Sequence, residues 1–199
     1  MGDLKVPAKG SRMRVIGVIP NQLVTDSLLE EPKIENGYAV ADVERDILKV
    51  AVIERHLASG NVGLGFVKGF GLKRGALGSS VAHDSHNLML VGTNDEDMLL
   101  AAREIEHMRG GLVAVEGGRV LASLPLPIAG LMSDRPFGEV NEGLTTLLSA
   151  AHDLGSDLYD PFMALSFLAL PVIPTLKITD KGLVDVSAMK IVDVVVEGG

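Results

Sequence analysis

Glycine is concentrated between Gly60 and Gly78, and this stretch constrains the fold more than any other feature of the sequence. It holds seven glycines, at positions 60, 63, 65, 69, 71, 75 and 78. Each glycine can adopt a positive φ angle or let another group approach the backbone closely. Because this freedom costs conformational entropy on folding, we expect the run to serve a specific purpose.

Charged and titratable side chains gather in and directly after the glycine run. Lys68, Lys73 and Arg74 lie inside it, in a chain whose formal net charge is −8. The polar sequence His83-Asp84-Ser85-His86-Asn87 follows. Backbone freedom, local positive charge and titratable groups therefore coincide between residues 60 and 97, which is the first place to look for a functional site.

The composition favours a sheet covered by helices. Of the 199 residues, 47% are hydrophobic but only 4% are aromatic, so Val, Leu, Ile, Ala and Met must build the interior. A chain of this length buries most of the surface that its unfolded form exposes. No uninterrupted apolar run reaches the ~18 residues of a membrane span.

Charge and cysteine content exclude several classes of function. The net charge of −8 opposes binding to nucleic-acid backbones and to anionic membranes, which attract basic surfaces. The absence of cysteine excludes disulfides, thiolate nucleophiles and cysteine metal ligands, and fits a cytoplasmic protein.

Short β-branched runs and amphipathic stretches alternate along the chain. The pattern predicts helices at 93–109, 137–154 and from Pro161 to the residue before Pro171, and strands at 13–19, 22–28, 38–41, 46–56, 76–82, 87–91, 112–115, 119–124, 177–179 and 184–196. We therefore expect an α/β or α+β fold, with a mixed β-sheet covered by two or three helices, and no TIM barrel. Residues 1–12 are expected to be a flexible leader and residues 13–199 a domain that could divide into two lobes near 110–135.

Two helix starts carry specific signals. Thr93 and Glu96 have the spacing of a capping box, so we expect the first helix to begin there. Asp160 followed by Pro161 is typical of an N-cap and first helical position. The helix after Pro161 is apolar all round, which predicts that it is buried on every side.

The polar sequence at 83–87 offers candidate catalytic residues, namely His83, Asp84 and His86. On an extended backbone His83 and His86 point to opposite faces, whereas Asp84 and His86 share one face and can pair. A carboxylate that fixes a histidine tautomer is common both in active sites and in ordinary hydrogen-bond networks. Catalytic and structural interpretations therefore both remain open, and the residues predict no metal site.

Further residues near the polar sequence are candidates for substrate binding, namely Lys68, Arg74, Ser80 and Asn87. The two cations could hold an anion or a carboxylate of another domain, although solvent exposure is the simpler expectation. The glycine run lacks the spacing of a Walker phosphate-binding loop. The serines lack the Gly-x-Ser-x-Gly motif that presents the nucleophile in serine hydrolases.

Five long stretches of the sequence are distinctive, namely RDILKVAVIERH (45–56), GNVGLGFVKGFGLKRGA (60–76), SSVAHDSHNLMLVGTNDEDM (79–98), LPLPIAGLMSD (124–134) and DPFMALSFLALPVIPTLKITDKGLVDV (160–186). In this order they resemble the C-terminal domain of bacterial and archaeal adenine deaminases, which belong to the amidohydrolase superfamily. The resemblance covers about residues 13–186. It implies an enzyme that hydrolyses adenine to hypoxanthine and ammonia with manganese or iron. In that family the metal is bound by a (β/α)8 barrel that opens with a His-x-His strand, and this sequence contains no His-x-His.

Two hypotheses follow from the resemblance. In the first, the chain is the C-terminal part of an adenine deaminase, and its 83–87 region shapes or closes the purine site of a catalytic barrel. No cofactor is then expected in this chain, which would be inactive alone, and adenine, the barrel and a second copy of the subunit are the expected partners. In the second, it is a non-catalytic module that binds a small ligand or holds subunits together.

Overall fold

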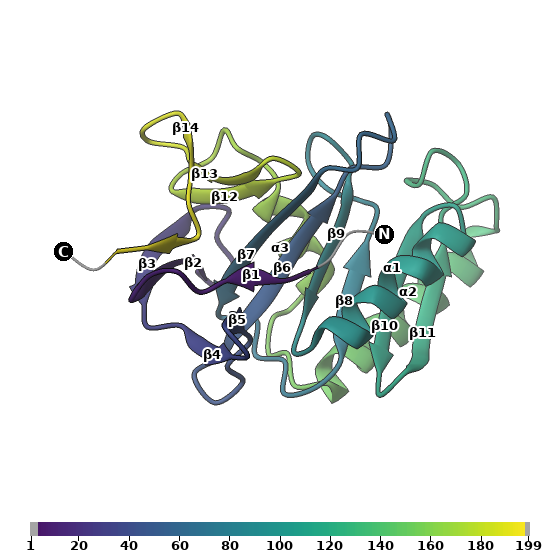
Figure 1. Ribbon diagram of the computed structural model, residues 1–199. Helices are drawn as coiled ribbons and strands as arrows, with labels where there is room; N and C mark the ends of the chain where they lie inside the picture. The colour runs from purple at the N-terminus through teal and green to yellow at the C-terminus, as the bar shows by residue number, and fades with distance from the viewer. Residues whose placement is uncertain (1–3, 198–199) are drawn as a thin grey trace.

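A nine-stranded sheet runs through the molecule and separates two layers, as the computed structural model of residues 4–197 shows (Figure 1). Its order is β11-β10-β8-β9-β6-β7-β2-β15, with β3 also paired to β2. The strands are β2 (Arg12–Val18), β3 (Thr25–Glu30), β6 (Ile47–Ile53), β7 (Val62–Lys68), β8 (Ala76–Ser79), β9 (Leu88–Gly92), β10 (Gly111–Glu116), β11 (Arg119–Pro125) and β15 (Val195–Val196). The β2–β7 pair is parallel whereas β6 pairs antiparallel with both neighbours, so the predicted mixed sheet is confirmed.

Helices and two small sheets cover the two faces of the large sheet. Helix α1 (Asp95–His107) lies on one face, while α2 (Phe137–Asp153) and α3 (Pro161–Leu168) lie on the other (Figure 1). The small sheets are β1-β5-β4, made of Val6–Pro7, Tyr38–Val40 and Lys33–Glu35, and β12-β13-β14, made of Leu176–Thr179, Gly182–Asp185 and Lys190–Val192. This α+β architecture contains no closed barrel in the described residues, as the sequence predicts.

The central strand β6 shows how the apolar pattern builds the core. Six of its seven residues are buried, as expected for a strand covered on both faces. Ala51 packs with the residues under α1, whereas Val50 and Val52 pack with those under α2 and α3. Alternate side chains point to opposite faces of a strand, so one apolar run supplies both cores.

The helix starts agree with the sequence in one case and differ in the other. Asp160 caps α3 by accepting a hydrogen bond from the Met163 N–H at 2.8 Å, as predicted. For α1 the N-cap is Asn94, whose side chain accepts from the Asp97 N–H at 2.8 Å, so the expected Thr93–Glu96 capping box is wrong by one residue. Thr93 instead donates its hydroxyl to the Gly75 carbonyl.

The glycine run contains a regular strand, β7, which the sequence analysis missed. A Cβ atom on Gly63 would lie 1.8 Å from the backbone oxygen of Thr179, so this glycine lets the β12–β13 turn sit directly on β7. After the strand, Gly69 and Gly71 adopt φ angles of 97° and 79° and donate their N–H groups to the Asp46 carboxylate. Close packing and a tight turn therefore explain much of the glycine content.

The expectation of a flexible leader is corrected for residues 4–12. Leu4 is 1% exposed and packs in the core under α1, and β1 pairs with β5. Residues 1–3 of the expected leader lie outside the described residues. The division suggested near 110–135 falls within the large sheet, because β10 joins β8 to β11.

Some strand boundaries also differ from the pattern. The strand expected at 22–28 begins at Thr25 instead, and the extended segment expected at 184–196 is divided among β13, β14 and β15. Asn36-Gly37 forms the predicted turn between β4 and β5. Among residues 4–197, no helix has the length and apolar character required to cross a bilayer.

Candidate functional site

The polar residues 83–87 form a turn between the end of β8 and the start of β9, which we call the histidine turn. The backbone is not extended here, because His86 has a φ angle of 49° and its N–H donates to the Ala82 carbonyl at 2.6 Å. The predicted pairing of Asp84 with His86 is absent from the described hydrogen bonds. The Nδ1 atom of His86 instead accepts from the Ala82 N–H at 3.3 Å.

Arg55 fastens the histidine turn to the rest of the molecule. It lies two residues after the end of β6. Its Nε donates to the His86 carbonyl at 2.5 Å, and its terminal nitrogen donates to the Ala129 carbonyl at 2.8 Å. Its own N–H donates to the Asn87 side-chain oxygen at 3.4 Å. Arg55 thus joins the turn to the loop after β11. The backbone of the turn is fixed by hydrogen bonds between residues that lie far apart in the sequence.

Burial and neighbouring charge favour the neutral form of His86. Burial lowers the pKa of His86, and the nearby His83 and Arg55 lower it further. A neutral His86 imidazole can accept the Ala82 N–H, which a protonated ring cannot do. Burial also lowers the pKa of the Arg55 guanidinium from its ordinary value.

Several polar groups of this region point outward and can meet a partner or ligand. Asp84, Ser85 and His56 are exposed, and the Nε2 atom of His56 contacts the Ser85 carbonyl at 2.8 Å. His83 is half-buried, with its ring centroid 4.6 Å from that of Phe167 on α3. The arrangement offers hydrogen-bond donors and acceptors beside an aromatic ring, which suits recognition of a heteroaromatic base.

The donor set does not fit a catalytic manganese or iron ion. Residues 4–197 contain no group of three or more His, Asp or Glu side chains arranged to hold a metal. His83 and His86 have ring centroids 6.0 Å apart, and His86 already uses Nδ1 for the turn. No reaction step is therefore assigned to a metal held by these residues.

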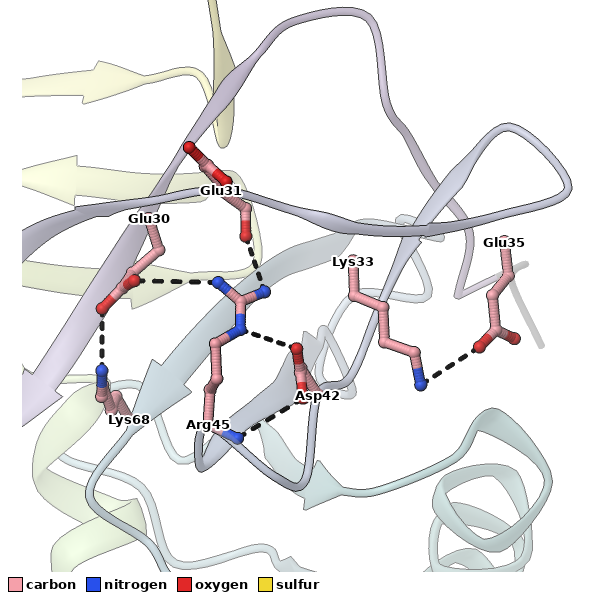
Figure 2. A network of polar contacts seen from close by, with 7 residues as sticks. All are labelled: Glu30, Glu31, Lys33, Glu35, Asp42, Arg45 and Lys68. Atoms are coloured by element: carbon pink, nitrogen blue, oxygen red, sulfur yellow. Dashed lines mark hydrogen bonds and ion pairs between the residues drawn. The ribbon is translucent and has the colours of Figure 1, made fainter.

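Lys68 belongs to a separate polar network, which Figure 2 shows around Arg45. The Lys68 Nζ lies 2.8 Å from a Glu30 carboxylate oxygen, and Arg45 lies 2.7 Å from Asp42 and 3.9 Å from Glu30. Lys68 pairs with the first residue of β6, whereas the histidine turn adjoins the last. Since β6 spans roughly 20 Å, the expectation that Lys68 extends the candidate site is corrected.

Arg74 and Ser80 are also occupied elsewhere. Arg74 pairs with Glu116 and donates to the Asp153 carbonyl at 2.7 Å, at the end of β8 opposite the histidine turn. Ser80 is fully buried, donates its hydroxyl to the Gly130 carbonyl at 2.6 Å and accepts from the Gly111 N–H at 2.8 Å. These contacts stabilise the fold and give neither side chain an open position beside the turn.

Among the four candidates for substrate binding, Asn87 alone lies in the histidine turn. It is 4% exposed, and its side-chain oxygen accepts a hydrogen bond from the Arg55 N–H, so it contacts the residue that holds the turn in place. Sequence reasoning missed Arg55 and His56 as members of this site. A cation placed shortly after a buried apolar strand is the signal that could have identified Arg55.

Comparison with known proteins identifies the class. The family model for the adenine deaminase C-terminal domain matches residues 22–190. Adenine deaminase of Methanothrix thermoacetophila is 56% identical over 184 residues, which cover 92% of this chain and 32% of the relative. Adenine deaminase 2 of Carboxydothermus hydrogenoformans is 56% identical over 192 residues, covering 96% and 34%, and that of Brucella abortus is 51% identical over 190 residues, covering 96% and 33%.

These relatives are named adenine deaminases, and the chain spans about a third of their length. The matched region includes the histidine turn, Arg55 and α3. The chain belongs to the adenine deaminase C-terminal domain family.

Proposed function

We propose that this chain works as the C-terminal part of an adenine deaminase, which hydrolyses adenine to hypoxanthine and ammonia. The observation that carries the proposal is the family match over residues 22–190, together with relatives that are named adenine deaminases. Because those relatives are about three times as long, the remaining two thirds of such an enzyme supplies the rest of the machinery.

The histidine turn contributes to the purine site without activating water. Asp84, Ser85 and His83 present acceptors and donors for the edge of a heteroaromatic base, on a backbone that Arg55 holds in place. A pre-arranged hydrogen-bonding surface lowers the entropic cost of positioning a substrate. We assign Arg55 and His86 to positioning and the exposed members of the turn to contact with the base.

The metal belongs to the other part of the enzyme in this proposal. The resemblance implies manganese or iron in a catalytic barrel, and the described residues offer no donor set of that kind. The metal would supply an activated hydroxide, while this domain shapes or closes the site. A cytoplasmic enzyme of purine metabolism, assembled as a homo-oligomer, is the setting that the resemblance and composition favour.

A chimera tests the proposal. The C-terminal third of Carboxydothermus adenine deaminase 2 is replaced by this chain, and ammonia release from adenine is measured with manganese or iron present. We expect activity from the chimera and none from the 199-residue chain alone. Turnover by the isolated chain, or an assembled chimera without activity, would contradict the proposal.

Variants of the chimera test the role of the histidine turn. Asp84→Asn removes a charged acceptor, and loss of such a hydrogen bond is expected to lower kcat/KM by about tenfold or more with little change in Tm. Glu106→Gln on α1 is the matched control, because that exposed carboxylate lies on the opposite face of the sheet and should leave kcat/KM unchanged. Equal kcat/KM for the two variants would remove Asp84 from the site.

A further inference from the structure

An apolar groove of about 780 Å³ lies between α3 and the loop that joins β2 to β3. Its lining includes the apolar residues Leu23, Val24, Phe70, Tyr159, Met163 and Phe167, together with the charged residues Asp157, Asp160 and Lys177. Leu23 is 46%, Tyr159 88% and Met163 49% exposed, so large apolar side chains stand open around the rim. A contiguous exposed apolar surface of this kind marks an interaction site rather than ordinary surface.

The outer face of helix α3 lines the groove and is only partly covered. The sequence of α3 is apolar all round, and Phe162, Leu165 and Leu168 are buried against the sheet. On the outer side Met163 is exposed and Ala164 and Phe167 are half-buried, which differs from the predicted burial on every side. The composition of α3 therefore matches a helix with a covering partner, because a surface helix normally carries polar residues on its outer face.

Lys177 places a buried positive charge in the lining of the groove. The residue is 0% exposed and lines the groove, and its Nζ donates to the Leu23 carbonyl at 2.7 Å. None of the ion pairs among residues 4–197 includes Lys177. An ammonium group has three N–H donors, so the Lys177 Nζ can donate to a further oxygen atom of whatever fills the groove.

We propose that this groove is the docking surface for the remaining, N-terminal two thirds of the adenine deaminase, which covers the outer face of α3 and places an oxygen atom against Lys177. The identity of this partner rests on the proposed function. The relatives carry about twice as much chain outside the region matched here, which is enough to form a partner domain that covers the groove. The groove is the place where the domain exposes an apolar helix face together with a buried cation.

Phe167 connects the groove with the histidine turn. Its ring lines the groove and also packs against the His83 ring, with centroids 4.6 Å apart. A partner seated on α3 therefore lies next to the histidine turn. Docking and completion of the purine site then involve neighbouring parts of the molecule, which the contact between Phe167 and His83 connects.

Hydroxyl-radical footprinting of the chimera tests this inference. Oxidation of Tyr159 and Met163 is measured by mass spectrometry in the 199-residue chain alone and in the full-length chimera. We expect both residues to react severalfold more slowly in the chimera. Met189, which is 78% exposed and lies outside the groove, gives the reference for radical dose.

Failure of the docking surface and failure of the proposed function have different signatures. A chimera that releases ammonia while Tyr159 and Met163 react as fast as in the free chain overturns the docking surface. A chimera that is inactive but protects both residues overturns the function and retains the docking surface.

A pair of substitutions gives a second test. Met163→Glu places a charge on the outer face of α3, so it should restore Tyr159 oxidation in the chimera to the rate of the free chain. Met189→Glu, at an exposed methionine outside the groove, should leave Tyr159 protected. Neither change should alter the stability of the free chain by more than about 0.5 kcal/mol, because both side chains are exposed there. Continued protection of Tyr159 in the Met163→Glu chimera overturns the inference.

Discussion

Buried cations in this domain are bonded to backbone carbonyls that lie far away in the sequence. Arg55 reaches the carbonyls of His86 and Ala129, Lys49 reaches that of Leu4, and Lys177 reaches that of Leu23. Each side chain therefore ties a loop or terminal segment to the central sheet. Lys49 also pairs with the Asp95 carboxylate at 2.5 Å. For Arg55 and Lys177 no ion pair is present among residues 4–197, and removing a charge from water is costly unless hydrogen bonds compensate, so the bonds to these carbonyls offset part of that cost.

Lys177 should make stability depend on pH in the alkaline range. Burial lowers its pKa from 10.5 to about 8, so between these values the unfolded chain binds more protons than the folded one. The free energy of unfolding contributed by Lys177 therefore rises as pH increases through this window. The Met side chain of the Lys177→Met variant does not titrate. The free energy of unfolding of the wild type, relative to that of this variant, should therefore rise by about 2 kcal/mol between about pH 7 and about pH 10.

Urea unfolding of both proteins at the two pH values measures this difference. The comparison cancels the titration of other lysines and tyrosines, which both proteins share. A difference in unfolding free energy that does not change with pH would mean that Lys177 is as well solvated in the folded chain as in the unfolded one.

At the scale of secondary structure, contacts between elements decide which segments become strands. Strand β7 contains Gly63 and Gly65 and has poor intrinsic strand preference, yet it pairs with β6 along its whole length and also with β2. The glycines leave room for β12 and β13, whose Ile178 and Leu183 reach the β7 backbone at Gly65. Tertiary packing therefore overrides local preference in β7.

Gly63→Ala should be strongly destabilising for this reason. The added Cβ would lie 1.8 Å from the backbone oxygen of Thr179, so β12 and β13 must shift away from β7. We expect a loss of about 1–3 kcal/mol in the free energy of unfolding, measured by urea denaturation. Gly138→Ala in α2 is the matched control, because its Cβ meets no atom within 4 Å, and it should stabilise the chain by about 0.5 kcal/mol. Equal effects of the two changes would contradict the packing argument.

At the scale of the whole molecule, one sheet joins both halves of the chain. Strands β10 and β11 come from the region where two lobes could have separated, and they extend the same sheet through β8. The apolar core under α2 and α3 draws residues from β2 at one side and β11 at the other, including Ile16 and Leu124. The described residues thus share their main core across the suggested boundary.

We expect the chain to unfold in a single cooperative transition. A shared sheet and core make partial unfolding expose apolar surface on both sides of any division. Differential scanning calorimetry should give equal calorimetric and van't Hoff enthalpies. Two resolved transitions, with one half of the chain retaining its amide-exchange protection after the first, would support separate lobes instead.

The sequence by itself determined the elements whose signals are local, and it determined the family. Helical periodicity placed α2, Asp160-Pro161 placed the start of α3, and Asn36-Gly37 placed the turn between β4 and β5. The capping of α1 was wrong by one residue, because Thr93 and Asn94 are both good caps and neighbouring contacts select between them. Long stretches of similar sequence identified the domain, because such a match does not require the role of each residue to be known.

Only the tertiary structure decided which polar residues share a surface. The candidate residues lie within 20 positions of one another, yet Lys68 and Arg74 are at one end of the strands and His83 to Asn87 are at the other. Arg55 and Ala129 are 74 positions apart, and Lys177 and Leu23 are 154 apart, yet each pair is hydrogen-bonded. Local patterns encode periodicity and capping, whereas strand order and burial depend on contacts between distant segments, so the histidine turn's framework and the groove on α3 emerged only from the folded chain.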